Sequence, residues 1–239
     1  SNLGLIFVGL EFGFWKKQGG IVALDLENGQ KKWEYTMPAY THSSPAYSEG
    51  QGVVVSGCND FCVYGFDAKR GNLLWKFITG GEVKGSFAFD EKRGLVACGS
   101  FDKQVYVLNI KTGELVYQIE TGEAIYSTPL IWEDRLFVAS LDKKLYCVDL
   151  STGKIAWEFE TGGRIFASPE AIGDNIYIGS NDGRLYELDA DTGKNTAFFQ
   201  ATERITNKIT YNKKTGRIFV PTFANEIYCI KRISKQVIL

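Results

Sequence analysis

Short apolar segments alternate with polar turn residues along the whole chain. The clearest stretch is residues 127–162, where LFVAS and LYCVDL stand in the middle of a run that ends with IAWEFE. Four short strands are expected there, at 129–132, 136–140, 145–150 and 155–160. The middle two are apolar on both faces, which is typical of strands in a sheet that is covered on both sides. No segment keeps a 3.6-residue period long enough for a helix, so the pattern predicts an all-β chain.

The same pattern recurs six times at a nearly constant interval. The residue that ends the third strand of each copy recurs after 42, 42, 40, 40 and 42 positions, at Asp25, Asp67, Asn109, Asp149, Asp189 and Lys231. A period of about 41 residues with several strands per copy is typical of propeller blades. The inner strand of a copy follows a Ser-Pro position, which falls at Pro45, Phe87, Pro129, Pro169 and Ile209 and is missing from the first copy. We therefore predict a single β-propeller domain over 1–239, with about six four-stranded blades and a first blade that lacks its Ser-Pro inner strand. The copies are expected at about 3–40, 41–84, 85–126, 127–166, 167–206 and 207–239.

An aromatic ring recurs on the outermost strand, four residues after a turn glycine. The glycines are Gly29, Gly71, Gly113, Gly153 and Gly193, and the corresponding later positions hold Trp33, Trp75, Tyr117, Trp157 and Ala197. A large ring that recurs once per blade is expected to pack between adjacent blades, because aromatic side chains bury a large area. Stacking on a cofactor is not favoured, since a cofactor occupies one site and the ring recurs in four copies.

Composition and charge exclude some classes of partner. The chain carries 27 basic and 28 acidic side chains, a formal charge of −1, so no broad attraction to nucleic acid or acidic lipid is expected. No apolar run approaches the ~20 residues of a membrane span. The five cysteines are an odd number. We interpret them as free thiols in a reducing, cytoplasmic compartment, or alternatively as small buried hydrophobic residues.

Two strings carry a resemblance to a known family, SPEAIGDNIYIGSNDGRLYELDADTGK at 168–194 and STPLIWEDRLFVASLDKKLYCVDLSTGKIAWEFETG at 127–162. Both resemble the PQQ repeat of the quinoprotein alcohol dehydrogenase-like propellers. The resemblance covers essentially the whole chain and is weaker in the first and last copies. The tryptophan-docking motif of that family maps onto 25–33, 67–75 and 149–157, whereas Tyr117 and Ala197 depart from it.

The resemblance implies PQQ, calcium ligands and a catalytic Asp only for the dehydrogenases of the family, which resemble eight-bladed propellers. Their alcohol dehydrogenases also stack two adjacent cysteines on the quinone. Here the nearest cysteines are Cys58 and Cys62, separated by what reads as a turn. The resemblance therefore favours the non-catalytic branch, with no PQQ and no calcium.

Candidate binding residues are those that differ between copies although the repeated sequence around them, the Ser-Pro frame, stays the same. They precede the inner strand of each blade, in loops that gather on one rim of a propeller, where binding residues are common. The candidates are Tyr40, His42, Glu82, Lys84, Tyr126, Arg164, Phe166 and Arg204. Ordinary loop variation with solvated charges is the alternative interpretation.

The first copy carries an insertion, because 16 positions separate Gly9 from Asp25 and only 10 separate Gly179 from Asp189. The insertion holds Phe12, Phe14 and Trp15, which the blade pattern does not require. Clustered exposed aromatics are typical of a partner surface, and the alternative is a longer hairpin that folds over the channel or onto a missing neighbouring region. The C-terminal residues 236–239 are expected either as the outer strand of the sixth blade or as a completion of the first.

Catalytic and metal sites are not indicated. His42 is the single histidine, which supports neither a catalytic triad nor a zinc site. The aspartates at the turn between the two middle strands are expected to bond their own turns rather than a shared calcium ion. These are Asp60, Asp102, Asp142 and Asp182.

The sequence thus predicts a binding or scaffolding propeller without catalytic activity, part of a larger protein or complex. It is expected to engage a protein or peptide, or a small ligand, on the channel rim, and to bind no nucleic acid. The alternative is a PQQ-binding oxidoreductase or sensor domain.

Overall fold

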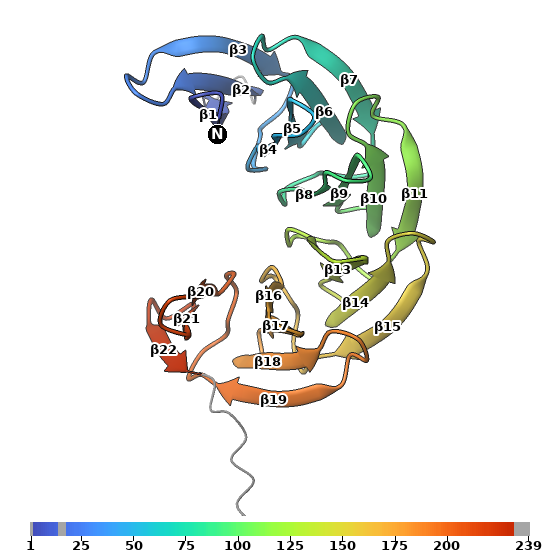
Figure 1. Ribbon diagram of the computed structural model, residues 1–239, viewed down its shortest axis with the longest axis vertical. Coiled ribbons are helices and arrows are strands. Elements are labelled where there is room, and N and C mark those ends of the chain that lie inside the picture. The colour runs from blue at the N-terminus through green and yellow to red at the C-terminus, as the bar shows by residue number, and fades with distance from the viewer. Residues whose placement is uncertain (1, 14–17, 232–239) are drawn as a thin grey trace, which may run out of the picture.

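The computed structural model describes residues 2–13 and 18–231 of the chain. Twenty-two strands and no helix lie in these ranges, and none of the described segments is a helix that could span a membrane. The strands form six antiparallel sheets, which we number one to six from the N-terminus. Each sheet is an up-and-down meander, and Figure 1 shows the six arranged as an open arc around a central space. The all-β prediction with four-stranded antiparallel sheets is confirmed.

Strands run in chain order from the inner to the outer edge of each sheet. Sheet one comprises β1 (Leu5–Phe12), β2 (Gln18–Asp25) and β3 (Lys31–Met37). Sheets two and three comprise β4 (Ala46–Ser48), β5 (Val53–Cys58), β6 (Cys62–Asp67), β7 (Leu73–Ile78), β8 (Ala88–Asp90), β9 (Leu95–Gly99), β10 (Gln104–Asn109) and β11 (Leu115–Glu120). Sheets four and five comprise β12 (Leu130–Trp132), β13 (Arg135–Ala139), β14 (Lys144–Asp149), β15 (Ile155–Glu160), β16 (Glu170–Ile172), β17 (Asn175–Gly179), β18 (Arg184–Asp189) and β19 (Asn195–Gln200). Sheet six comprises β20 (Thr210–Asn212), β21 (Arg217–Pro221) and β22 (Ile227–Lys231).

The middle strands of sheets two to five are buried on both faces because each of these sheets packs between two neighbours. Phe137 and Leu145 of sheet four share a core cluster with Ile176 and Ile178 of sheet five, and all four side chains are inaccessible to solvent. This is why LFVAS and LYCVDL lack the alternation of a half-exposed strand.

The recurring rings join neighbouring sheets. Trp157 Nε1 of sheet four donates a hydrogen bond to the Ala190 carbonyl of sheet five at 3.2 Å. The same contact recurs from Trp33 to Ala68, from Trp75 to Ile110, and from the Tyr117 hydroxyl to Leu150. Gly193 lies under the Trp157 ring with φ of 69°, and a β-carbon there would lie 2.5 Å from Cδ2 of the indole. Glycine is therefore required both by the backbone conformation and by the close approach of the ring.

The turn aspartates do more than bond their own turns. Asp142 accepts the Lys144 amide of its own turn at 2.9 Å, and it also accepts the Gly122 amide at the end of sheet three at 2.7 Å. The Tyr146 hydroxyl donates a third hydrogen bond at 2.6 Å. Burial and the neighbouring Asp142 carboxylate raise the pKa of Tyr146. The same link to the preceding sheet recurs at Asp102 and Asp182.

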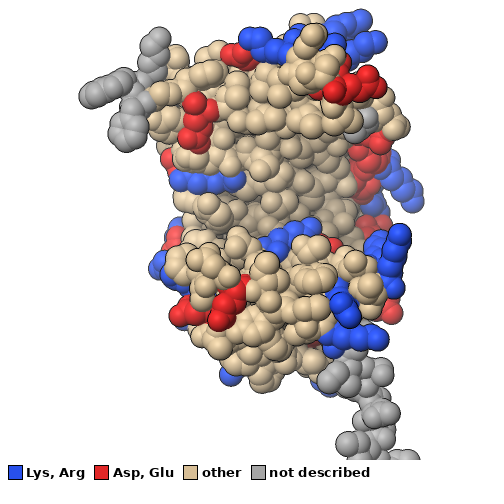
Figure 2. Space-filling model, turned by 90° about the vertical axis from the view of Figure 1, so that its left-hand side faces the viewer, with Lys and Arg blue, Asp and Glu red and all other residues tan. Residues whose placement is uncertain are grey.

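The described parts of the first and last sheets do not meet. Sheet one lacks a strand inside β1, and sheet six lacks one outside β22, so far as the described residues go. Figure 1 shows the opening between them, and Figure 2 looks into it at an inner wall that is mostly uncharged. Ile227 of β22 is 70% exposed, whereas its repeat equivalent Leu185 in sheet five is 2% exposed. The sequence hypotheses for Gln236–Leu239 lie outside the described residues.

Candidate functional site

A belt of hydrogen bonds around the inner edge supports the rim. The Ser43 hydroxyl donates to the Gly85 carbonyl at 2.8 Å, and the Ser86 hydroxyl donates to the Ser44 carbonyl at 2.9 Å. Thr128 continues the belt, because its hydroxyl accepts the Ser86 amide while its own amide donates to the Ser168 hydroxyl. The Ser-Pro frame therefore connects sheets two to five below the rim loops.

Three of the predicted rim residues lie in one row of side chains. Lys84 Nζ lies 4.5 Å from the centre of the Phe101 ring, a cation–π contact. Phe101 packs against Tyr126 with ring centroids 6.0 Å apart, and Tyr126 packs edge-on against Phe166 at 5.8 Å. We call these four residues the aromatic row. It starts in the loop between sheets two and three and ends in the loop between sheets four and five.

The row combines apolar surface with a fixed charge. Tyr126 at its centre is 45% exposed, so its ring is available to a partner. Lys84 pairs with Glu82 at 2.5 Å, which holds the ammonium beside the Phe101 ring. Exposed aromatic side chains are typical of surfaces that bind protein segments.

A second group of predicted residues lies beside the insertion in sheet one. β1 and β2 pair over eight positions, so the insertion lengthens this hairpin. His42 Nε2 lies 3.1 Å from the Glu11 carboxylate, and its Nδ1 lies 3.0 Å from the Asn59 amide nitrogen. Tyr40 packs against His42 with centroids 6.0 Å apart. The described part of the hairpin thus reaches the rim.

The insertion aromatics are only partly described. Phe12 is half-buried, at the end of β1. Phe14 and Trp15 lie outside the described residues. The β1–β2 hairpin is long, and both sequence hypotheses for the insertion, a partner surface or a hairpin that folds over the channel or a neighbouring region, stay predictions.

The remaining candidates stand apart from the aromatic row. The Arg204 guanidinium lies 3.7 Å from the centre of the Phe223 ring, at the rim of sheets five and six. Arg164 is exposed, and its carbonyl accepts the Asn181 amide.

Sequence reasoning missed Phe101 and Phe223. Both occupy the turn between the two middle strands, one residue before the aspartate or its equivalent. Their column reads Asn59, Phe101, Leu141, Asn181 and Phe223, and it varies between copies as the rim positions do. This variation between copies could have marked the column as a candidate binding position. It is informative, however, only once the turn between the two middle strands is known to lie against the rim loop.

The donor set of a quinoprotein dehydrogenase does not fit the described residues. They contain no group of three or more His, Cys, Asp or Glu side chains that could hold a metal ion. Cys58 and Cys62 are both buried, and each thiol donates to a backbone carbonyl, of Ala39 and Asp60 respectively. We therefore assign no step to PQQ or calcium.

Comparisons with known structures agree with the fold. BamB from Moraxella catarrhalis superposes with a TM-score of 0.75 at 15% identity, over 95% of this chain and 76% of that one. The computationally designed Ika8 protein superposes with a TM-score of 0.79 at 15% identity, over 94% of this chain and 71% of that one. At this identity the likeness shows the fold alone. No curated protein sequence matches the chain.

The family comparison is more specific. The model of the family described as "Beta-alanine-activating enzyme, beta-propeller" matches residues 16–239, which is nearly the whole chain. A match of this extent assigns the propeller to that family, whereas the finer resemblance to PQQ repeats stays a prediction. The chain belongs to the β-propeller family of the β-alanine-activating enzymes.

Proposed function

We propose that this propeller is a non-catalytic recognition module that binds a protein or peptide segment along the aromatic row. The observation that carries the proposal is the continuous contact of Lys84, Phe101, Tyr126 and Phe166 across three sheets. A frame built from repeats does not need these rings, because the equivalent positions hold unrelated side chains in the other copies.

The arrangement suits an extended segment rather than a small molecule. The row lies on a rim that the Ser-Pro belt supports, and the Tyr126 ring at its centre is exposed. A peptide lying along it would place apolar side chains against Tyr126 and Phe166. Exposed aromatic anchors on a rigid scaffold often provide most of the binding free energy of such contacts.

The family suggests where the partner lies. We propose that the propeller is one module of a larger enzyme that activates β-alanine, because the family description names a β-alanine-activating enzyme together with its β-propeller. In this proposal the aromatic row contacts another part of that enzyme or a protein that works with it. The cytoplasmic location and the absence of a bound cofactor remain parts of the same proposal.

A displayed random peptide library tests the proposal. Peptides selected on the wild-type chain should bind with micromolar Kd, and Tyr126→Ala should weaken them about tenfold or more. The matched control is Leu74→Ala on β7, where a side chain of similar exposure, 49%, lies away from the rim. Selected peptides that bind Tyr126→Ala and the wild type equally, or a library that yields no binder, would contradict the proposal.

A further inference from the structure

Sheet six reverses the charge on one face of the propeller. This face lies opposite to the aromatic row, and it carries the turn between the first two strands of each sheet and the end of the third strand. In sheets two to five each of these turns contains a carboxylate, and in sheets one to five the third strand ends in Asp or Asn. The turn residues are Glu49, Glu91, Glu133 with Asp134, and Asp174, and the strand ends are Asp25, Asp67, Asn109, Asp149 and Asp189. In sheet six the turn holds Lys213 and Lys214 instead, and the third strand ends in Lys231.

Four cations meet around this turn. Arg217 begins β21 and stands directly opposite Lys231 of β22 in the strand register. The Lys231 side chain also lies beside the turn, because its Cε is 4.0 Å from the place where a β-carbon on Gly216 would stand. Lys213, Lys214, Arg217 and Lys231 are all exposed, and we call them the basic corner. Figure 2 shows Lys and Arg side chains gathered at this end of sheet six, at the lower right.

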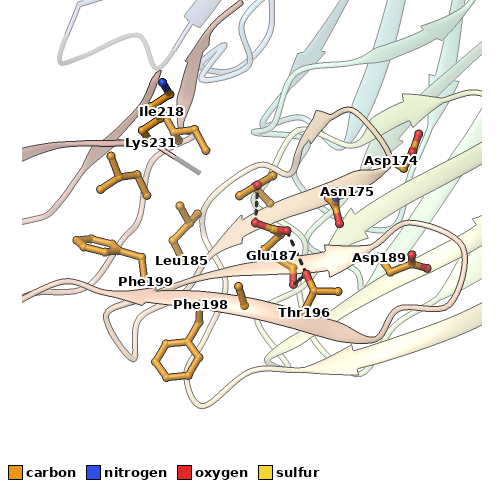
Figure 3. Close-up of a pocket in the computed structure, with 13 residues that line it drawn as sticks. Asp174, Asn175, Leu185, Glu187, Asp189, Thr196, Phe198, Phe199, Ile218 and Lys231 are labelled. Atoms are coloured by element: carbon orange, nitrogen blue, oxygen red, sulfur yellow. Dashed lines mark hydrogen bonds between the residues drawn. The ribbon is translucent and has the colours of Figure 1, made fainter. Parts of the chain in front are cut away.

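The charge of the basic corner is not balanced within the described part of the chain. Lys208, in the loop before β20, pairs with Glu170 of sheet five at 2.7 Å, whereas none of the four cations makes an ion pair within residues 2–13 and 18–231. The pocket between sheets five and six has Asp174 and Asp189 at one end and Lys231 at the other, as Figure 3 shows. The residues that follow, 232–239, contain no Asp or Glu in their sequence.

The strand register places two like charges opposite each other in the basic corner. The equivalent pair in sheet four is Arg135 with Asp149, which have opposite charges. Like charges directly opposite each other in an antiparallel pair are unfavourable, so an anion bound beside Arg217 and Lys231 would relieve their repulsion. The chain as a whole has a formal charge of −1, so this attraction for anions is local to sheet six.

We propose that the basic corner binds an acidic segment of a protein. An extended chain with several Asp or Glu side chains matches four cations that are spread over a turn and two strand ends, and complementary charge steers such a partner and fixes its position. A single phosphate group is held better by free backbone amides. Here the amides of Lys214 and Thr215 donate to the Asn212 side chain, and the amide of Gly216 donates to the Asn212 carbonyl, so these amides are not available to a phosphate.

Octaglutamate with a fluorescein label is the probe, and fluorescence anisotropy measures its binding to the whole chain. We expect a Kd on the order of 10 µM at low salt. Because the basic corner is exposed, raising the salt concentration from about 20 to about 300 mM should weaken the binding about tenfold or more. A labelled glycine–serine peptide of the same length carries no side-chain charges and should not bind.

Charge reversal in the turn locates the probe. Lys213→Glu/Lys214→Glu should weaken octaglutamate about tenfold or more, and the milder Lys213→Gln/Lys214→Gln about threefold or more. Both side chains are exposed, and the Asn212 side chain accepts only backbone amides in this turn, so both variants should keep the circular dichroism of the wild type. The matched control is Lys69→Glu/Arg70→Glu, which makes the same change of net charge at two exposed cations in a turn on the same face. Arg70 there lies 3.9 Å from the Asp67 carboxylate, and the control should bind octaglutamate within about twofold of the wild type.

Two other polyanions decide between an acidic segment and other classes of partner. An oligothymidylate of about twelve nucleotides and phosphatidylserine vesicles should both bind more weakly than octaglutamate. Equal or tighter binding of either one would overturn the inference, as would no binding of octaglutamate at about 1 mM, or equal losses in the Lys213→Glu/Lys214→Glu variant and its control.

The aromatic row and the basic corner can be tested separately. Tyr126→Ala should bind octaglutamate as the wild type does, and Lys213→Glu/Lys214→Glu should bind the peptides selected on the aromatic row as the wild type does. A failure of one proposal in these measurements therefore leaves the result for the other unchanged.

Discussion

Replacing Asp142 by Ala should destabilise the propeller, because one carboxylate joins sheets three and four. The loss of its hydrogen bond leaves the Tyr146 hydroxyl without an acceptor in a side chain that is 5% exposed, at a cost of about 2 kcal/mol. The Lys144 amide loses its partner within the turn, which adds about 1 kcal/mol. The Gly122 amide is exposed and can bind water instead, so its contribution is small. We expect a total loss of about 3 kcal/mol in the free energy of unfolding.

Urea unfolding at neutral pH, followed by circular dichroism and by fluorescence, measures this loss. Glu120→Ala at the exposed end of β11 is the control and should change the free energy of unfolding by less than about 0.5 kcal/mol. Tyr146→Phe should lose about 1 kcal/mol, and the Asp142→Ala/Tyr146→Phe double variant should lose less than the sum of the two by about 2 kcal/mol, because it has no hydroxyl left without an acceptor. A loss below about 1 kcal/mol in Asp142→Ala, or strict additivity in the double variant, would refute the role assigned to the carboxylate.

Three further predictions concern backbone, thiols and pH. Gly193→Ala should lower the free energy of unfolding by about 3 kcal/mol in a urea titration, because the new methyl group meets the indole of sheet four. Gly173 has a similar positive φ but open space around it, so Gly173→Ala should lower the free energy of unfolding by only about 1 kcal/mol. Equal losses in the two variants would exclude the ring contact as the cause. Cys229 is the exposed cysteine, and burial raises the pKa of the thiols of Cys58, Cys62, Cys98 and Cys147. Only Cys229 should therefore react rapidly with a disulfide reagent at pH 8. A second thiol that reacts as fast would contradict the structure. Hydrogen bonds from the Ser151 hydroxyl and from turn amides lower the pKa of Asp149 to about 2. The stabilisation from this turn is therefore complete above about pH 4 and is lost as the pH falls towards about 2. If NMR shows that the Asp149 carboxyl titrates near the ordinary Asp value, the turn does not form.

The fold was predictable because the repeat determines the register of every copy at once. The expected third strand of the fourth copy, at 145–150, differs by one residue at each end from β14, which spans Lys144–Asp149. Such agreement follows from turn residues that end each strand for a local reason, as the Asp149 carboxylate does by accepting the amides of its own turn. The arrangement of the first and last sheets relative to each other was not predictable, because the repeat pattern describes one copy at a time and does not say which copies are adjacent where the ring would close.

The binding rim was predictable only as a set of positions. The variable loop residues were found by comparing the copies, but which of them meet depends on turns from other strands. Phe101 connects Lys84 to Tyr126, and it lies in a turn that was interpreted only through its aspartate. These contacts join different positions of the repeat, 17 and 25 residues apart in the chain, and a comparison of aligned columns does not show them.

The rim and sheet five depart from the repeat in physically different ways. At the rim, Tyr126 is exposed, so the frame would be equally stable with many other side chains there. At sheet five, Ala197 stands where four other sheets carry a ring, and Glu187 opposite it is 7% exposed and accepts hydrogen bonds from Tyr177 and Thr196. A side chain inside a sheet is fixed by its neighbours, whereas an exposed side chain on the rim can be replaced without loss of the fold. The aromatic row therefore gives the argument for a partner that approaches an open surface.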